Sequence, residues 1–206
     1  MKDLVIVGAG GFGRETALMI EQLHAWNLIG FYDDGLEPGT IMEGKPVVGK
    51  VSSLNENQSE VAVVIAIADP STRQRIAVSL TNKKLSFPTV AHPTALMGHL
   101  SNSFGKGCII TAGVILTTGI TIGDFVIVNL STTIGHDVCI DHYTSIMPQC
   151  SISGSVKLGE RCFVGSGSRI LQGISIGDDS IVGAGAVVTK SFEANSKLVG
   201  VPAQKI

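Results

Sequence analysis

The stretch that decides the fold runs from Ile122 to Ile146 and reads IGDFVIVNLSTTIGHDVCIDHYTSI. Within it an aliphatic residue recurs at every sixth position, and apolar residues keep this spacing without a break from Phe104 to Val188. A period of six fits neither a helix nor a simple alternating strand, but it is typical of a hexapeptide parallel β-helix. In that fold each hexad supplies one strand and one turn, three hexads form a triangular coil, and the aliphatic side chain points inward.

A second position of the hexad, four residues after the aliphatic, holds small or β-branched residues. Cys108, Cys150 and Cys162 all fall on it, so we expect core thiols rather than redox or metal-binding groups, because a free cysteine packs like a small hydrophobe. Cys139 lies off this position and is left undecided. Glycine often follows the aliphatic directly, which we attribute to tight corners where glycine tolerates positive φ.

The preceding part of the chain, residues 1–95, predicts a Rossmann-like α/β domain built on the βαβ pattern, and the β-helix domain then covers residues 96–206. Strands are expected at residues 4–7, 28–32, 61–68 and 87–90, with a Gly/Pro-rich loop before the third. Residues 14–24 place apolar side chains at helical spacing, and a second helix is expected to begin near Asp69 with Pro70 in its first turn.

The first predicted strand runs into a glycine-rich turn. Gly8, Gly10 and Gly13 fit the G-x-G-x-x-G spacing of a dinucleotide site, and Asp33 stands where such sites carry an acidic residue. However, 95 residues are too few for the usual six-stranded dinucleotide fold. We therefore expect a smaller ligand, with its phosphates at the helix N-terminus and its ribose or base near Asp33 or Asp34. A purely structural glycine turn is the alternative.

Charge and targeting features exclude some classes of function. The formal net charge is -2, from 15 basic and 17 acidic residues, and no basic cluster is present. This argues against a nucleic-acid or anionic-membrane surface, because both need a concentrated Lys/Arg footprint. The apolar run after Met1 is too short for a signal peptide or a spanning helix. We expect a cytoplasmic protein.

The sequence Ile134-Gly135-His136-Asp137 places a histidine outside the packed interior with a carboxylate beside it. A histidine supported by a carboxylate is a candidate general base near neutral pH. His142 occupies the same hexad position one repeat later, on a neighbouring side of the triangle. Ordinary surface-turn histidines are the alternative interpretation of both.

The sequence as a whole resembles one family. The features that carry the resemblance are the glycine turn, the Asp33-Asp34 pair, the unbroken hexads with His136-Asp137 and the C-terminal Gly200-Val201-Pro202-Ala203. This family is the sugar O-acyltransferases of the sialic acid O-acetyltransferase type, which includes bacterial N-acetyltransferases that act on nucleotide-linked amino sugars. The resemblance covers essentially the whole chain. It implies a homotrimer of left-handed β-helices, acetyl-CoA as co-substrate between neighbouring subunits, a nucleotide sugar held by the N-terminal domain, and no metal.

The resemblance also implies roles for individual residues. His136 matches the catalytic base, and Asp137 matches the carboxylate that raises its basicity. The positions that match contacts of acetyl-CoA are Ser145, Ser166 and Ala184. The positions that match contacts of the nucleotide sugar are Gly10, Gly11, Phe12, Asp33, Asp34 and Ala68. Phe12 replaces a histidine and Ala68 replaces a glycine common in the family, and these departures concern the identity of the acceptor more than the reaction.

The favoured function is transfer of an acetyl group from acetyl-CoA to the amine of a nucleotide-linked amino sugar. O-acetylation of a sialic acid or related sugar is the alternative within the family. Outside it stand a zinc-dependent lyase, with His99, His136 and His142 as candidate ligands, and a non-catalytic nucleotide-binding scaffold. Since no hexad is interrupted by a long loop, the acceptor site has to come from the N-terminal domain and a neighbouring subunit.

Overall fold

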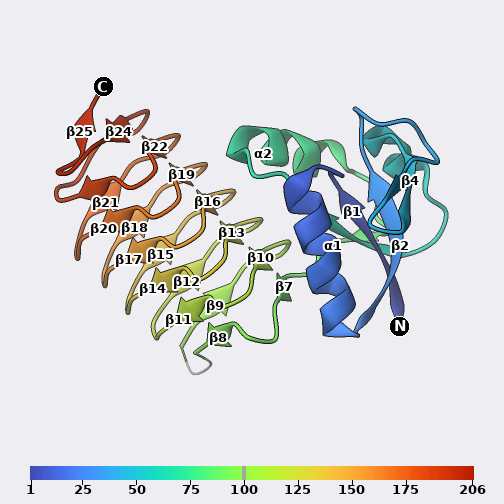
Figure 1. The fold of residues 1–206 in the computed structure, drawn as a ribbon, viewed down its shortest axis with the longest axis horizontal. Helices are drawn as coiled ribbons and strands as arrows, with labels where there is room; N and C mark the ends of the chain where they lie inside the picture. The colour runs from blue at the N-terminus through green and yellow to red at the C-terminus, as the bar shows by residue number, and fades with distance from the viewer. Residues whose placement is uncertain (99–100) are drawn as a thin grey trace.

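The computed structural model describes residues 1–98 and 101–206. An α/β domain lies at one end of a long β-helix, whose coils follow one another in chain order toward the C-terminus (Figure 1). The α/β domain contains one sheet in the order β3-β4-β2-β1-β5-β6, parallel except for the β3–β4 pair. Its elements are β1 (Lys2–Val7), α1 (Gly11–Leu23), β2 (Trp26–Tyr32), β3 (Ile41–Met42), β4 (Lys45–Gly49), the 3-10 helix η1 (Val51–Glu56), β5 (Val61–Ile65), α2 (Pro70–Ser79) and β6 (Leu85–Ser86).

Most elements of this domain form where the sequence predicts them. Helix α1 follows directly on Gly10, and α2 begins at Pro70, whose missing N–H is tolerated in a first turn. The Asp69 side chain caps α2 by accepting a hydrogen bond from the Thr72 N–H at 2.8 Å. The Gly/Pro-rich segment that we predict as a loop contains regular elements, since residues 41–56 form β3, β4 and η1.

The strand predicted at residues 87–90 is wrong as an element of this domain. The last strand of the α/β sheet is β6, and Val90 instead begins β7 (Val90–Ala91), which pairs with β10 of the β-helix. Hydrogen bonding to the β-helix therefore starts before residue 95, the predicted boundary between the domains. A short apolar run carries no sign of which sheet it will join.

The β-helix has three parallel sheets, one for each side of the triangle. In each, a strand pairs with the strand three hexads later, as Ile110 does with Val128. The first side contains β7, β10 (Ile109–Ile110), β13 (Ile127–Val128), β16 (Ser145–Ile146), β19 (Phe163–Val164), β22 (Ile181–Val182), β24 (Lys197–Val199) and the antiparallel β25 (Gln204–Lys205). The second side contains β8 (Leu96–Met97), β11 (Ile115–Leu116), β14 (Thr133–Ile134), β17 (Ser151–Ile152), β20 (Arg169–Ile170) and β23 (Val187–Val188). The third side contains β9 (Ser103–Phe104), β12 (Thr121–Ile122), β15 (Cys139–Ile140), β18 (Lys157–Leu158) and β21 (Ser175–Ile176).

The interior of the coils is filled by the repeat aliphatics and by the small residues between them. Cys108, Cys150 and Cys162 are buried there, whereas Cys139 is exposed. Burial raises the pKa of the Cys150 and Cys162 thiols to about 11, because it disfavours the thiolate. The three inward cysteines therefore remain neutral core thiols, as predicted.

The glycine directly after the aliphatic serves a different purpose than the positive φ that we predict for it. The residues with positive φ stand three places after the aliphatic, and non-glycine residues such as Asp137 (φ 58) and Tyr143 (φ 60) fill many of these positions. The glycine directly after the aliphatic is needed because the next coil approaches it closely. A Cβ on Gly135 would lie 2.7 Å from the Gly154 nitrogen.

The two domains share their packing. Ile109 and Ile127, on the outside of the first side, are buried with residues of α1, β1 and β2. Phe125, at the corner between the third and first sides, is buried against the opposite face of the α/β sheet with Val5 and Leu54. These contacts seat the α/β domain firmly on the first coils of the β-helix.

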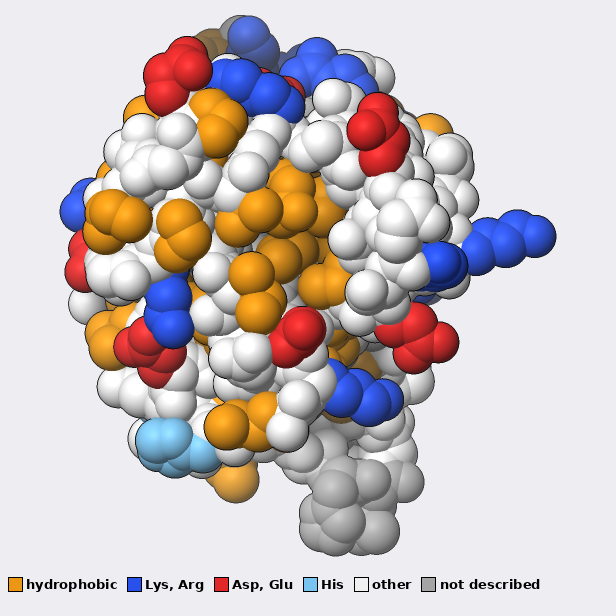
Figure 2. Space-filling model, turned by 90° about the vertical axis from the view of Figure 1, so that its right-hand side faces the viewer, with side chains coloured by type: hydrophobic (Ala, Val, Ile, Leu, Met, Phe, Trp, Pro, Cys, Tyr) orange, Lys and Arg blue, Asp and Glu red, His pale blue; other side chains and the backbone are white. Residues whose placement is uncertain are grey.

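The outer end of the α/β domain is shown in Figure 2. Hydrophobic side chains occupy its centre, and side chains of both charge signs surround them. Within the described residues, no helix combines the length and the apolar character that crossing a membrane requires.

An ion pair at the corner between the third and first sides gives a first prediction. Arg161 donates to Asp179 through Nε and Nη2, at 2.7 and 2.8 Å, and also contacts Glu160. These hydrogen bonds hold the pKa of Asp179 below its usual value. Asp179→Asn keeps a residue that tolerates φ 57 but removes the charge. It should lower the free energy of unfolding at pH 7 by about 1 kcal/mol, the scale of partly exposed pairs.

The sign of the pH dependence follows from the lowered pKa. A carboxylate with a depressed folded-state pKa stabilises the protein above its unfolded-state pKa, and this stabilisation is lost as pH falls through the folded-state value. Urea unfolding of both chains should therefore show a difference at pH 7 that disappears in acid. Equal stability at pH 7 would mean that the pair contributes nothing measurable.

Candidate active site

The predicted dyad lies at the corner between the second and third sides. His136 and Asp137 occupy the turn between β14 and β15, and the imidazole Nδ1 lies 2.8 Å from the Asp137 Oδ2. A carboxylate accepts hydrogen bonds, so Nδ1 carries the hydrogen and Nε2 of the neutral ring keeps its lone pair. Both side chains reach solvent, with exposed fractions of 52% and 67%. The arrangement supplies a proton acceptor with a carboxylate behind it.

Two glycines of adjacent coils lie against the dyad. A Cβ on Gly154, one coil after His136, would lie 2.5 Å from Nε2, and a Cβ on Gly119, one coil before, would lie 2.5 Å from the Asp137 Oδ1. Gly119 also has φ +70, but Gly154 has no positive φ and its backbone does not require glycine. Gly154 is the only glycine at its hexad position between Lys106 and Lys190. The sequence carried this signal, and our prediction did not use it.

The second histidine is part of the β-helix hydrogen bonding. His142 Nδ1 accepts the backbone N–H of Asp124 at 2.8 Å, so the hydrogen of the neutral ring is on Nε2, which faces the Asp141 carboxylate at 3.5 Å. Asp141, His142 and Glu160 are close enough to share a cation. An imidazole that accepts a hydrogen bond on one nitrogen and carries a hydrogen on the other has no lone pair for a metal.

The zinc alternative therefore does not fit His142, because both nitrogens of its ring are engaged. His136 keeps a lone pair on Nε2, but it lies at a different corner of the chain from His142. His99, the third candidate ligand, lies outside the described residues.

The glycine turn between β1 and α1 combines structural and open positions. A Cβ on Gly13 would lie 1.9 Å from the Gly8 carbonyl oxygen, and Gly8 itself has φ +98. These two glycines are therefore required by the fold. Gly10 and Gly11, by contrast, have open space where a Cβ would be. They leave the first backbone amides of α1 accessible to a ligand.

A cavity of about 470 Å³ lies beside this turn, at the carboxyl ends of β1, β2 and β5. Ligands of open α/β sheets bind at this edge, where neighbouring connections diverge. Asp33 and Asp34 both line the cavity, together with Gly8, Tyr32 and Arg75. The first two were predicted from sequence. Arg75 was not, because a helical arginine has no distinguishing pattern.

The two aspartates also shape the cavity. The Asp33 carboxylate accepts the N–H groups of Ala9 and Gly35, each at 2.8 Å, and Asp34 accepts the N–H of Val51 at 2.9 Å. Asp33 thus ties the end of β2 to the glycine turn. Phe12 is half-buried and packs against the core around α1, and it does not line this cavity.

Ser145 and Ala68 meet at the junction of the domains. The Ser145 side chain is fully buried, and its hydroxyl donates to the Ala68 carbonyl at 2.7 Å. The hydroxyl is therefore engaged within the chain and is not free for acetyl-CoA. A hexad pattern fixes which side of the coil a residue occupies, but not whether another domain covers it.

Ser166 and Ala184 lie at the corner between the first and second sides. They are exposed and stacked in adjacent coils, where the Gly185 N–H donates to the Ser166 carbonyl at 2.8 Å. Within one chain they occupy a different corner from His136.

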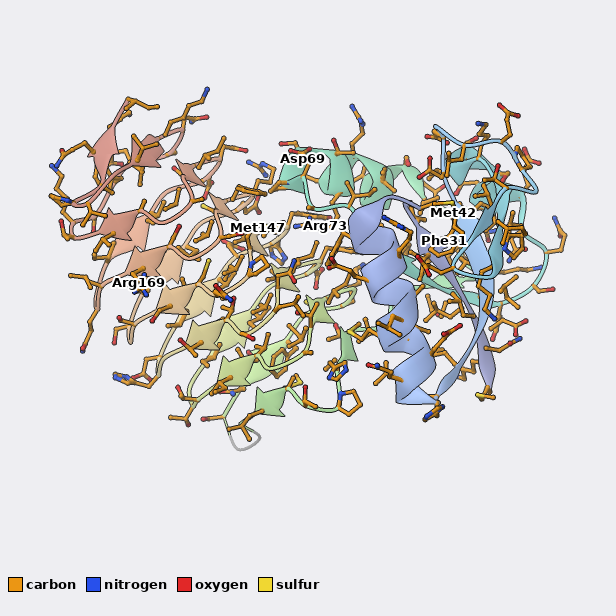
Figure 3. The ribbon with its side chains drawn as sticks, viewed as in Figure 1. Phe31, Met42, Asp69, Arg73, Met147 and Arg169 are labelled. Carbon is orange, nitrogen blue, oxygen red and sulfur yellow. The ribbon has the colours of Figure 1, made fainter. Side chains whose placement is uncertain are left out.

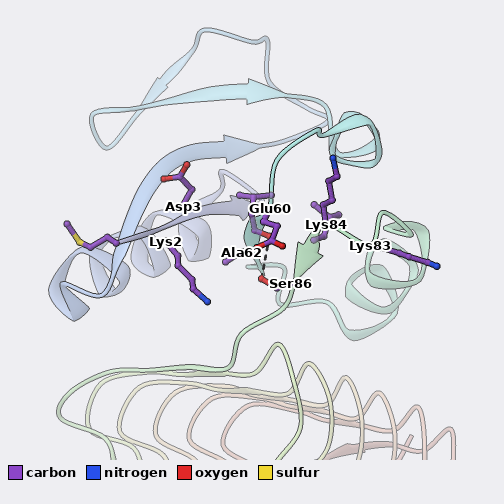
Figure 4. Close-up of a pocket in the computed structure, with 10 residues that line it drawn as sticks. Lys2, Asp3, Glu60, Ala62, Lys83, Lys84 and Ser86 are labelled. Atoms are coloured by element: carbon purple, nitrogen blue, oxygen red, sulfur yellow. Dashed lines mark hydrogen bonds between the residues drawn. The ribbon is translucent and has the colours of Figure 1, made fainter.

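A further cavity, of about 440 Å³, lies at the amino ends of the strands. Charged side chains of Lys2, Asp3, Glu60 and Lys84 surround it (Figure 4). It is at the edge of the sheet opposite the glycine turn and contains none of the predicted site residues.

Comparison with known proteins agrees with both domains. Residues 3–80 match the family model described as the PglD N-terminal domain, and residues 155–190 match the hexapeptide repeat of succinyl-transferase. The GDP-perosamine N-acetyltransferase of Escherichia coli O157:H7 is 31% identical over 186 residues, which cover 87% of this chain and 82% of that protein.

Two solved structures superimpose along the whole chain. PerB from Caulobacter crescentus, in complex with CoA and GDP-perosamine, has a TM-score of 0.91 at 29% identity and covers 100% of this chain and 98% of its own. The acetyltransferase domain of PglB from Neisseria gonorrhoeae FA1090, in complex with acetyl coenzyme A, has a TM-score of 0.93 at 28% identity and covers 100% and 99%. The predicted left-handed β-helix with an N-terminal α/β domain is confirmed.

Proposed function

Because the chain belongs to the hexapeptide-repeat acetyltransferase family of GDP-perosamine N-acetyltransferase, we propose that it transfers an acetyl group from acetyl-CoA to the amine of a nucleotide-linked amino sugar. The observation that carries this proposal is the His136–Asp137 hydrogen bond, which leaves Nε2 free at an exposed corner of the β-helix. The relatives that match along most of the chain include the GDP-perosamine N-acetyltransferase of Escherichia coli O157:H7 and the perosamine N-acetyltransferase of Caulobacter crescentus. They favour N-acetylation over the alternative of O-acetylation of a sialic acid.

The role of His136 is to take a proton from the attacking amine. As the sugar nitrogen bonds to the thioester carbonyl carbon, Nε2 accepts its proton, and the carbon–sulfur bond then breaks. The proton leaves with the thiolate as the CoA thiol. Asp137 stabilises the imidazolium that forms, the division of labour known from hydrolase triads. No serine or cysteine nucleophile is required.

We propose a backbone N–H as the donor to the oxyanion, because the Ser145 hydroxyl donates to the Ala68 carbonyl. The Gly154 N–H lies in the coil against which the His136 ring packs, and it donates to no acceptor among the described residues. A backbone donor aimed at the developing oxyanion is worth roughly 3 kcal/mol in other enzymes. Gly154 can therefore serve the reaction through its amide while its missing side chain leaves room for the imidazole.

The acceptor's nucleotide is assigned to the cavity beside the glycine turn. Its base or ribose would lie near Asp33 and Asp34, which line the cavity. Its phosphates would extend beyond the cavity lining to the open amides at Gly10 and Gly11, where the helix dipole favours negative charge. Acetyl-CoA would lie against Ser166 and Ala184 of a neighbouring copy. Within one chain, Ser166 and Ala184 lie at a different corner of the β-helix from His136. This separation supports a homotrimer with sites between subunits.

The proposed function is tested by CoA release and by mass spectrometry of the acceptor. GDP- and UDP-linked amino sugars are each incubated with the chain and acetyl-CoA, and the matching sugar that lacks the amine serves as control. We expect acetylation of at least one amino sugar and none of the control. Nucleotide binding without turnover across the panel would favour the scaffold alternative, and acetylation of the control would favour O-acetylation.

Asp33→Asn gives a prediction for the nucleotide cavity. An amide in place of the carboxylate cannot accept both backbone N–H groups, so the end of β2 and the glycine turn should separate. We expect the affinity for a nucleoside diphosphate to fall about tenfold, the equivalent of one lost hydrogen bond to a charged group. Isothermal titration with GDP and UDP measures this.

The control for this variant is Asp3→Asn, at the amino end of the same sheet, where the carboxylate accepts a hydrogen bond from the exposed Asn27 side chain. It should bind nucleotides like the unmodified chain. Equal affinity in Asp33→Asn would contradict the assignment of the nucleotide to this cavity.

A further inference from the structure

Arg73 of α2 is fully buried, although it is a charged residue. It lies between α2 and the β-helix (Figure 3). No carboxylate is hydrogen-bonded to it among the described residues, and burial lowers its pKa to about 9 by disfavouring the charged form. An unpaired charge is costly to bury. A buried guanidinium without a carboxylate therefore needs several other hydrogen-bond acceptors around it.

Those partners are four backbone carbonyls from two domains. Nη1 donates to Ile67 at 2.6 Å and to Ala68 at 3.2 Å, both in the loop between β5 and α2. Nε donates to Phe125 at 2.8 Å, and Nη2 donates to Tyr143. The last two carbonyls belong to stacked turns at the corner between the third and first sides of the β-helix. One guanidinium therefore joins α2, its preceding loop and two coils.

The same loop is held from the β-helix a second time. The Ala68 carbonyl accepts the Ser145 hydroxyl as well as Arg73 Nη1. Ser145 lies in β16 and Tyr143 stands two residues before it, so both contacts anchor the loop to one coil. Ala68 is a position where the family resemblance implies a contact with the acceptor.

Helix α2 also forms a wall of the nucleotide cavity. Thr72, Arg75, Ile76 and Ser79 line it, whereas Arg73 points into the domain junction. The helix thus has one side toward the proposed acceptor and one residue fixed to the β-helix that carries His136. A change at Arg73 would move the acceptor relative to the catalytic corner without removing any group from the cavity.

We infer that Arg73 is a positioning residue for acetyl transfer, which fixes α2 and the Ile67–Ala68 loop to the β-helix so that the acceptor is held in place relative to the dyad. The inference rests on the proposed function. This position requires arginine for a geometric reason. The planar guanidinium donates to carbonyls in several directions at once, whereas a lysine ammonium is a single point charge on a flexible stem.

Arg73→Lys and Arg73→Met test this inference. Misplacement by about 1 Å can lower a rate by about a hundredfold, so we expect kcat with the nucleotide-linked amino sugar to fall at least tenfold in both. The dissociation constant for GDP or UDP and the KM for acetyl-CoA should stay within about twofold of the unmodified chain. Ser145→Ala, which removes only the second tie to Ala68, should lower kcat less.

The control for a general loss of stability is Ile174→Val, in the β-helix core. It should lower Tm and leave kcat unchanged. If Arg73→Met fails to fold, the kcat and the nucleoside diphosphate affinity of Arg73→Lys alone test the inference. A kcat within twofold of the unmodified chain overturns the inference, and so does a lost nucleoside diphosphate affinity in Arg73→Lys. An unmodified chain that acetylates no amino sugar overturns the proposed function and this inference together.

Discussion

Replacing His136 with alanine should lower kcat for acetyl transfer by about 10²- to 10⁴-fold, the range attributed to a general base. The reason is specific to Nε2. Its partner nitrogen is committed to Asp137 at 2.8 Å, so Nε2 is the ring nitrogen that remains to accept a proton. The measurement is thiol release from acetyl-CoA at saturating acceptor, with the KM of both substrates determined in parallel.

Stability should not change with this substitution, since the His136 side chain is half exposed and buries little surface. An intact thermal transition and intact nucleotide binding serve as controls for folding. His142→Ala is not a matched control, because His142 Nδ1 accepts a backbone N–H and its loss disturbs the coil. A rate within tenfold of the unmodified chain would show that His136 is not the base.

The fold was predictable because each hexad of the β-helix has the same packing requirement. Every coil needs an inward aliphatic at the same place, so a single misplaced polar residue would interrupt the pattern, and none does between Phe104 and Val188. The same regularity predicted three buried cysteines. The α/β domain was predictable in outline because its glycine turn has a steric origin, in the 1.9 Å approach of a Gly13 Cβ to the Gly8 carbonyl.

The contacts between the domains were not predictable from sequence. Ser145 has the right hexad position for an exposed site, but the loop at Ala68 covers it. Arg73 lies in a helix with no marked apolar face, and its partners are backbone carbonyls, which leave no trace in residue type. Periodicity reports which way a side chain points from its own element. It cannot report what another domain places there.

Gly154 shows the opposite case, where sequence and geometry together identify a residue. The positions two places after the repeat aliphatic hold charged, polar and apolar side chains, and glycine occurs among them only in the coil that follows His136. Since Gly154 has no positive φ, the backbone would accept alanine. The space that its missing Cβ leaves is taken by the imidazole, which would lie 2.5 Å from that atom.

Gly154→Ala should therefore separate stability from activity. An alanine at a position with ordinary φ restricts the unfolded chain, so the free energy of unfolding should be unchanged or higher by up to about 1 kcal/mol. The imidazole, however, has to move by a substantial fraction of an ångström, because Cβ contacts under 3.0 Å do not persist. We expect kcat to fall about a hundredfold, the scale of a misplaced catalytic group.

The matched control is Gln172→Ala, at the same hexad position and the same corner one coil further on. It should retain kcat, since it leaves the neighbourhood of His136 untouched. Combining Gly154→Ala with His136→Ala supplies the decisive comparison, because a Cβ that acts by displacing the imidazole has no effect once the imidazole is gone. If Gly154→Ala lowers the rate of the His136→Ala chain as strongly as that of the unmodified chain, then the added methyl does not act through the position of His136.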